Sequence, residues 1–286
     1  MVRIVARHPI DESTVDGEQE ALRSHLTTLL SLLPRASDKW GFALSTAENL
    51  LSVLALHDPS CRSAAAREAA RLSENIAVGL FNVTGSYFAG NRDSVRLMIG
   101  DQEYQLPAEP NSWAYCYAWR TAFWWSLIAR DAAAADRLSR YPVDQLSPKG
   151  MGRTDDFQYE WVRILQLAWS QNPGSAVDRV NALDTTTGLP GAEIRRIIGL
   201  LNKPVIAAFA KLAVGDHAGF NDELFQALTQ HRKFFDTKKS RNDIGGFLSI
   251  PILGLSCWAH DLGVPIDVES EYIPKNFIED PDWMRK

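Results

Sequence analysis

A histidine next to an aspartate can bind a metal ion or transfer a proton, and the sequence has such a pair at His260-Asp261. Together with Asp216, the pair could form the metal site of an uncharacterised hydrolase. A metal site needs further His and Asp ligands at compatible spacing, and the six histidines form neither an HExxH nor an HxH motif. The local sequence therefore predicts no metal ligand and no catalytic residue, and metal bound to the purified protein would contradict this.

A short pattern recurs around this pair and indicates an architectural role for it. Its copies are LALHD at 54–58, LIARD at 127–131, a looser AWSQN at 168–172, LAVGD at 212–216 and CWAHD at 257–261. In each copy an apolar helix ends, and Asp or Asn stands where the chain turns, because short Asx side chains bond nearby backbone N–H groups. From the second copy on, the spacing is on the order of 40 residues, as in paired-helix repeats. We interpret His260-Asp261 as one of these helix endings.

Two further groups of charged residues could do chemistry, but each has a structural explanation. Asp155, Asp156 and Glu160 resemble a carboxylate cluster, yet Thr154 precedes them as a candidate N-cap. Carboxylates in a first turn stabilise the helix dipole by roughly 0.3–1 kcal/mol each. Arg120 is the only charge in an apolar helix, and an unpaired buried guanidinium is costly. We expect Arg120 to pair with Asp155, Asp156 or Glu160.

The remaining reactive residue types do not form a known enzyme signature. The sequence has no GxSxG, P-loop or GxGxxG motif. Its three cysteines lie far apart in apolar helical contexts, so we expect reduced core residues. The nine tryptophans could line a ligand pocket, but most lie on helix stripes and are expected in the core. We expect no cofactor.

Composition restricts the class of protein. The chain has 286 residues with 45% hydrophobic content, which is enough for a sizeable core. Its start lacks the apolar stretch of a secretion signal and no run is long enough to span a membrane, so the cytoplasm is the expected compartment. A net charge of −5 makes nucleic acid an unsuitable ligand and weakly favours a basic protein partner.

Hydrophobic periodicity predicts helices along most of the chain. The expected helices cover residues 17–34, 36–57, 62–88, 112–129, 154–170, 175–186, 192–213, 220–236 and 243–262. Asn221 is a candidate N-cap, and Pro204 and Pro251 should kink or interrupt their helices. A β-hairpin is predicted at about 94–106, because apolar residues alternate on both sides of the turn Gly100-Asp101. It should pack on the helices through its apolar face, at Val95, Leu97 and Tyr104.

These elements predict an all-α protein. The simplest architecture is an irregular α-helical solenoid or layered helical bundle with one inserted hairpin. We expect a single domain over residues 1–286, with a helical bundle at 1–92, the hairpin insertion at 93–108 and a paired-helix array at 109–286.

The C-terminal segment GFLSIPILGLSCWAHDLGVPIDVESEYIPKNFIE resembles the immunity protein 49 family of bacterial polymorphic toxin systems. MVRIVARH at the start and HRKFF at 231–235 add to the resemblance, which is best over 225–279 and includes VESEYIP at 268–274. It implies a mainly helical, non-catalytic protein that neutralises the toxin encoded beside it by binding. A helical-repeat scaffold for another protein is the alternative, and the neighbouring gene distinguishes the two. The resemblance identifies neither the toxin nor an oligomeric state.

For an immunity protein, we expect the binding surface to combine exposed aromatic and acidic side chains. The segment DVESEY at 267–272 fits this expectation through Asp267, Glu269, Glu271 and Tyr272. The alternative is that Val268 and Tyr272 only fasten the C-terminal tail to the body.

Overall fold

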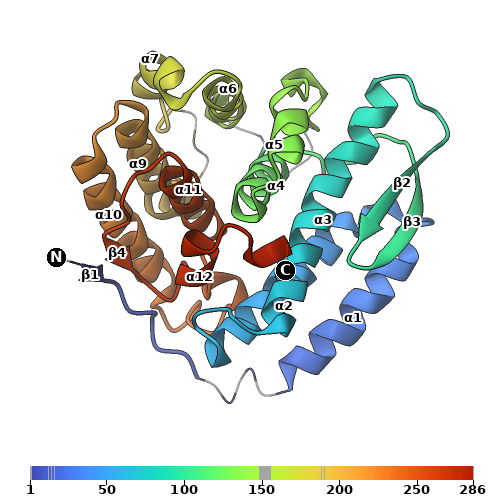
Figure 1. Cartoon of the computed structure of the whole chain (residues 1–286), viewed down its shortest axis with the longest axis horizontal. Helices are drawn as coiled ribbons and strands as arrows, with labels where there is room; N and C mark the ends of the chain where they lie inside the picture. Colours follow the sequence, from blue (N-terminus) through green and yellow to red (C-terminus); the bar gives the residue numbers. More distant parts are fainter. Residues whose placement is uncertain are drawn as a thin grey trace.

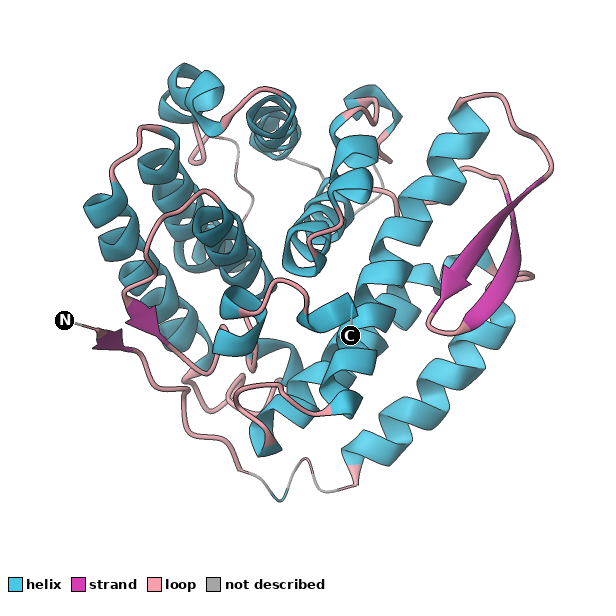
Figure 2. Cartoon of the chain, viewed as in Figure 1, coloured by secondary structure: helices cyan, strands magenta, loops and turns pink. Residues whose placement is uncertain are grey.

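Helices make up 64% of the protein, which confirms the predicted all-α class (Figures 1 and 2). The computed structural model describes residues 2–11, 13, 15, 17–147, 156–187, 189 and 191–285. A continuous cluster of buried apolar side chains extends from Val5 to Met284. Within the described ranges, no helix combines the length and apolar character needed to cross a bilayer.

The first helices follow the predicted pattern. They are α1 (Glu18–Leu32), α2 (Trp40–His57) and α3 (Ala64–Phe88), with a 3-10 turn at Ser37–Lys39 before α2. Ser63 begins α3 as its N-cap, since its side chain accepts a hydrogen bond from the Ala66 N–H.

The predicted hairpin is present beside α3 (Figure 2). Strands β2 (Ser94–Ile99) and β3 (Gln102–Pro107) are antiparallel, and Gly100 takes the left-handed φ of 63° that the turn requires. Tyr104 is buried, and the half-buried Val95 and Leu97 pack against the hydrophobic core, as expected. Ile99 and Leu106 are buried as well.

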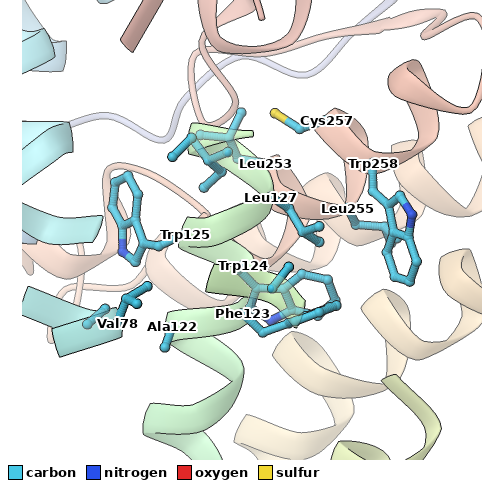
Figure 3. Packing of buried hydrophobic residues seen from close by; sticks show 14 of the residues in the cluster. Val78, Ala122, Phe123, Trp124, Trp125, Leu127, Leu253, Leu255, Cys257 and Trp258 are labelled. Atoms are coloured by element: carbon cyan, nitrogen blue, oxygen red, sulfur yellow. The ribbon is translucent and has the colours of Figure 1, made fainter. Parts of the chain in front are cut away.

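Helix α4 (Cys116–Ala129) is enclosed by neighbouring helices, as its apolar sequence predicts. Figure 3 shows its side chains between residues of α3 and of α11 (Ile250–Asp261). Phe123 meets Trp258 of α11 edge to face at 5.7 Å between ring centroids. Gly254 allows the close approach, because a Cβ there would lie 2.9 Å from the Cβ of Trp124.

A short helix that the sequence analysis missed follows α4. Helix α5 (Ala132–Ser139) starts where Asp131 accepts the Ala134 N–H at 2.9 Å. After it come α6 (Asp156–Ser170), a 3-10 turn at Pro173–Ala176 and α7 (Val177–Asn181), which is much shorter than the predicted 175–186.

Pro204 interrupts its helix as predicted. Helices α8 (Ala192–Ile197) and α9 (Lys203–Ala213) are joined by the π-helical segment Ile198–Asn202, which lies just before the proline. Proline has no N–H to donate to the preceding turn, so the regular ladder cannot continue through it.

The expected role of Asn221 as an N-cap is wrong. Helix α10 (His217–Phe235) begins earlier, with Asp216 as its cap, so Asn221 lies inside the helix. Its buried side chain donates to the Pro265 carbonyl and accepts the Asp267 N–H. Helix α11 likewise begins at Ile250 rather than 243, because Pro251 is favoured in a first turn.

Most copies of the repeated Asx pattern bond to backbone as expected. Asp131, Asn172 and Asp216 cap the elements that follow them, and Asp58 accepts the Ser63 N–H at 2.8 Å. Asp261 is different, since it is still helical and binds Arg130 through both carboxylate oxygens at 2.9 and 3.2 Å. The prediction that Asp261 is a turn residue is therefore wrong, because its side chain forms an ion pair with Arg130.

Arg130 joins the end of α4 to the C-terminal segment. It takes a left-handed φ of 53° as the cap of α4, and its guanidinium is largely buried. Besides Asp261, it donates to the carbonyls of Phe277 and Ile278 in α12 (Lys275–Glu279). Its own carbonyl accepts from Arg285. One side chain thus connects α4, α11 and α12.

We predict that Arg130→Ala lowers the free energy of unfolding by about 2–4 kcal/mol, because buried carbonyls lose their charged donor. Arg130→Gly should lose about 1 kcal/mol less, since glycine adopts the left-handed conformation without strain. Urea denaturation measures both. If the two variants are as stable as the wild type, the side chain does not hold the C-terminal segment.

Candidate functional site

The candidate metal ligands of a hydrolase were Asp216, His260 and Asp261, and they do not form a metal site. Asp216 caps α10 and pairs with Lys211 at 3.0 Å, while Asp261 pairs with Arg130. In the part of the chain that the structure describes, no three His, Cys, Asp or Glu side chains are grouped so that they could hold a metal ion. His260-Asp261 is therefore part of a helix end that an ion pair holds.

The cysteines are poorly suited to nucleophilic chemistry. Cys61, Cys116 and Cys257 are free thiols in the core, as expected. Burial raises the pKa of Cys61 and Cys257 to about 12 and that of Cys116 to about 11. At neutral pH all three are thiols rather than the reactive thiolates.

The segment predicted to bind a partner also pairs with the strand at the start of the chain (Figure 1). Strand β4 (Val268–Glu269) pairs in parallel with β1 (Arg3–Ile4). The Arg3 N–H donates to the Asp267 carbonyl at 2.9 Å, and the Val5 N–H donates to the Glu269 carbonyl at 3.0 Å.

Tyr272 is fully buried, so it is not one of the exposed aromatic side chains expected of a binding surface. Its hydroxyl accepts the His8 backbone N–H at 2.8 Å and bonds His8 Nδ1 at 2.7 Å. His8 Nε2 lies 2.9 Å from the Arg241 carbonyl, which can only accept, so Nε2 donates and Nδ1 accepts from the tyrosine. Burial lowers the pKa of His8, which favours its neutral form. Tyr272 fastens the two chain ends together.

The three carboxylates of this segment differ in their surroundings. Glu271 accepts the Arg7 N–H at 3.2 Å and so belongs to the same fastening. Glu269 is exposed and pairs with Lys275 at 3.3 Å, and Asp267 is exposed as well. Asp267 and Glu269 lie beside Ile4, which is 71% exposed. We call Asp267 and Glu269 the acidic edge.

Arg120 is buried in α4, but its expected partner Glu160 lies elsewhere. Glu160 pairs with Arg179 at 3.1 Å and Arg163 at 3.6 Å. Asp155 and the side chain of Asp156 lie outside the described residues, so their pairing with Arg120 stays a prediction. Arg120 is 5% exposed, and its Nη1 has no hydrogen-bond partner.

Aromatic rings lie beside this guanidinium. The Tyr117 ring centroid is 5.9 Å from Arg120 Cζ, and the Tyr115 ring stacks on Tyr117 at 6.3 Å. Trp113 follows at 6.4 Å from Tyr115, and Phe42 of α2 meets it edge to face at 5.5 Å. We call Phe42, Trp113, Tyr115 and Tyr117 the aromatic patch.

The aromatic patch is both exposed and fixed in position. Phe42 and Tyr117 are 51% and 54% exposed, which is unusual for rings of this size on a helical surface. Trp113 donates its ring N–H to the Asp38 carbonyl at 2.8 Å. It also lies so close to Gly41 that a Cβ there would clash with its ring. Rigid rings at a surface bind partners with little loss of conformational entropy.

Glu48 of α2 is a second charged group near these rings. Its Oε1 accepts the Trp125 ring N–H at 2.8 Å, and burial raises the pKa of its carboxyl to about 7. Exposed rings above partly buried charged groups are suited to recognition of another protein rather than to bond cleavage. The sequence analysis did not predict the aromatic patch, although WAYCY at 113–117 has three aromatic residues within five positions.

A family model described as immunity protein 49 matches residues 58–277, which is most of the chain. The match includes the acidic edge and three residues of the aromatic patch, which are Trp113, Tyr115 and Tyr117. Neither the curated proteins nor the solved structures contain a match to this chain.

We predict that the free energy of unfolding of Glu48→Gln, relative to that of the wild type, increases as pH rises from 4.5 to above 7. In the folded wild type the pKa of Glu48 is about 7, which is above its ordinary value of 4.5. The protonated carboxyl therefore stabilises the folded wild type fully below pH 4.5, and this stabilisation is lost as pH rises through 7. The difference should reach roughly 1–2 kcal/mol, allowing for the partial exposure of the side chain. Urea denaturation of both proteins at pH 4.5, 6 and 8 measures it. A constant difference would show that Glu48 ionises normally.

Proposed function

Since this chain belongs to the immunity protein 49 family, we propose that it is a non-catalytic immunity protein that binds and neutralises a cognate bacterial toxin. The observation that carries the proposal is the family match over residues 58–277. The aromatic patch and the acidic edge, described above, supply side chains of the kind that bind proteins.

Neutralisation by binding requires a rigid surface rather than reactive groups. A stable inhibitor complex buries about 800 Å² on each partner, with most of the affinity in a few central aromatic or arginine side chains. The aromatic patch provides such side chains on a surface held by Trp113 and Gly41. Because its backbone is already positioned, binding costs little ordering entropy.

Charge supports a basic toxin as the partner. The chain carries a net charge of −5, and Asp267 and Glu269 are exposed together at the acidic edge. Opposite charge on a partner raises the association rate and sets its orientation. The acidic edge thus contributes to steering rather than to the buried centre of the complex.

We predict that this protein protects bacteria that express the toxin domain encoded by the adjacent gene. Co-expression should restore growth, and the two proteins should co-purify as a complex. The control is a toxin domain from another system, which should neither be neutralised nor co-purify. Growth arrest together with the absence of a complex would contradict the proposal and favour a scaffold for another cellular protein.

We also predict that Asp267→Lys with Glu269→Lys slows association with the toxin about tenfold at low salt, and less at high salt. The matched control is Asp101→Lys with Glu103→Lys in the hairpin, which changes net charge equally at another exposed site. Surface plasmon resonance at two salt concentrations gives the rates. Equal rates for the two double variants would mean that only net charge matters and the acidic edge has no local role.

A further inference from the structure

Arg120 differs from the two half-buried arginines of the described chain that also have an unpartnered side-chain nitrogen. In Arg7 and Arg241 this atom is Nε, but Arg7 donates to the carbonyls of Ala55 and Glu271. Arg241 forms an ion pair with Asp236. Within the described residues, Arg120 has neither a hydrogen bond nor an ion pair, although it is 5% exposed.

The charge on Arg120 persists despite its burial. Burial lowers the pKa of the guanidinium to about 10, which still leaves it protonated at neutral pH. Removing an unpaired charge from water is strongly unfavourable, and a partner of opposite charge offsets this cost. No described side chain offsets this cost at Arg120.

The surroundings of Arg120 favour an anion. The side chain belongs to the second turn of α4, near the positive end of the helix dipole, and the N-cap Tyr115 forms no side-chain cap. Glu48 does not neutralise it, since its carboxylate bonds Trp125 and forms no ion pair among the described residues. The Tyr117 ring covers one side of the group, with its centroid 5.9 Å from Arg120 Cζ, and Tyr115 stacks on that ring.

On the basis of the proposed function, we infer that the aromatic patch is the toxin-binding surface and that a carboxylate of the toxin pairs with Arg120. A planar guanidinium binds a carboxylate through two parallel hydrogen bonds, which fixes the orientation of the partner. The exposed ring of Tyr117 lies beside the guanidinium and helps to exclude water from the ion pair in the complex. The partner chemistry is thus an Asp or Glu side chain, or a C-terminal carboxylate, among apolar residues.

The test is Arg120→Met in the full chain, measured against the catalytically inactive toxin domain from the adjacent gene. We expect the melting temperature of the free protein to stay the same or rise, because an unpaired buried charge is replaced by an apolar side chain of similar length. We expect toxin affinity to fall at least about 30-fold, as for loss of a buried charge pair. The control Arg96→Met in the hairpin should change neither property.

The sequence-based pairing of Arg120 with Asp155 or Asp156 makes the opposite prediction. If one of these carboxylates neutralises Arg120, then Asp155→Asn with Asp156→Asn should lower the melting temperature, and so should Arg120→Met. This result together with unchanged toxin affinity of Arg120→Met would overturn the inference. An unchanged melting temperature in the Asn double variant supports it.

Tyr117→Ala tests the surface without changing a buried charge. We expect about a tenfold loss of toxin affinity, while Met98→Ala, at a similarly exposed apolar residue of the hairpin, should have no effect. If Arg120→Met does not fold, the comparison of Tyr117→Ala with Met98→Ala decides whether the aromatic patch binds the toxin. Failure of the wild-type protein to bind the toxin counts against the proposed function, whereas wild-type affinity in both Arg120→Met and Tyr117→Ala overturns only the choice of surface.

Discussion

The enclosure of α4 is the constraint on which the rest of the structure depends. Trp119, Phe123 and Trp125 are fully buried, and α3, α5, α6 and α11 pack around the helix that carries them. Every residue of α4 except Tyr117 is buried, and such a helix cannot shift without opening the core, because protein interiors are close-packed. Packing fixes the positions of the two arginines that the helix carries, which are Arg130 at its C-terminal end and Arg120 near its N-terminal end.

The two arginines show how one rigid helix serves structure and recognition. Arg130 has a full set of acceptors, so its burial stabilises the joint between α4 and the C-terminal segment. Arg120 has no acceptor within the described residues, so none of these residues offsets the cost of burying its charge. Natural proteins keep such unfavourable groups where function needs them, and a binding partner that supplies the missing carboxylate would explain this one.

Local signals in the sequence predicted much of the fold. The alternation around Gly100 gave the hairpin, and Asx residues marked helix boundaries at Asp58, Asp131 and Asp216. What the sequence did not predict depends on contacts between distant segments. Tyr272 bonds His8 across 264 positions, and Asp261 meets Arg130 across 131. Periodicity carries no information on such pairs. The sequence of residues 267–272 therefore suggested an exposed binding surface, although Tyr272 is buried in the core. The aromatic patch was missed for the same reason, since Phe42 joins it from another helix.

The most direct test of the account is a double-mutant cycle between Arg120 and each acidic residue of the cognate toxin, measured by calorimetry. The cycle isolates the interaction between two side chains from the effects of each substitution alone. The account predicts that one toxin carboxylate is coupled to Arg120 by more than about 1.5 kcal/mol. Coupling energies below about 0.5 kcal/mol for every toxin carboxylate, in a complex that the wild-type proteins form tightly, would contradict it.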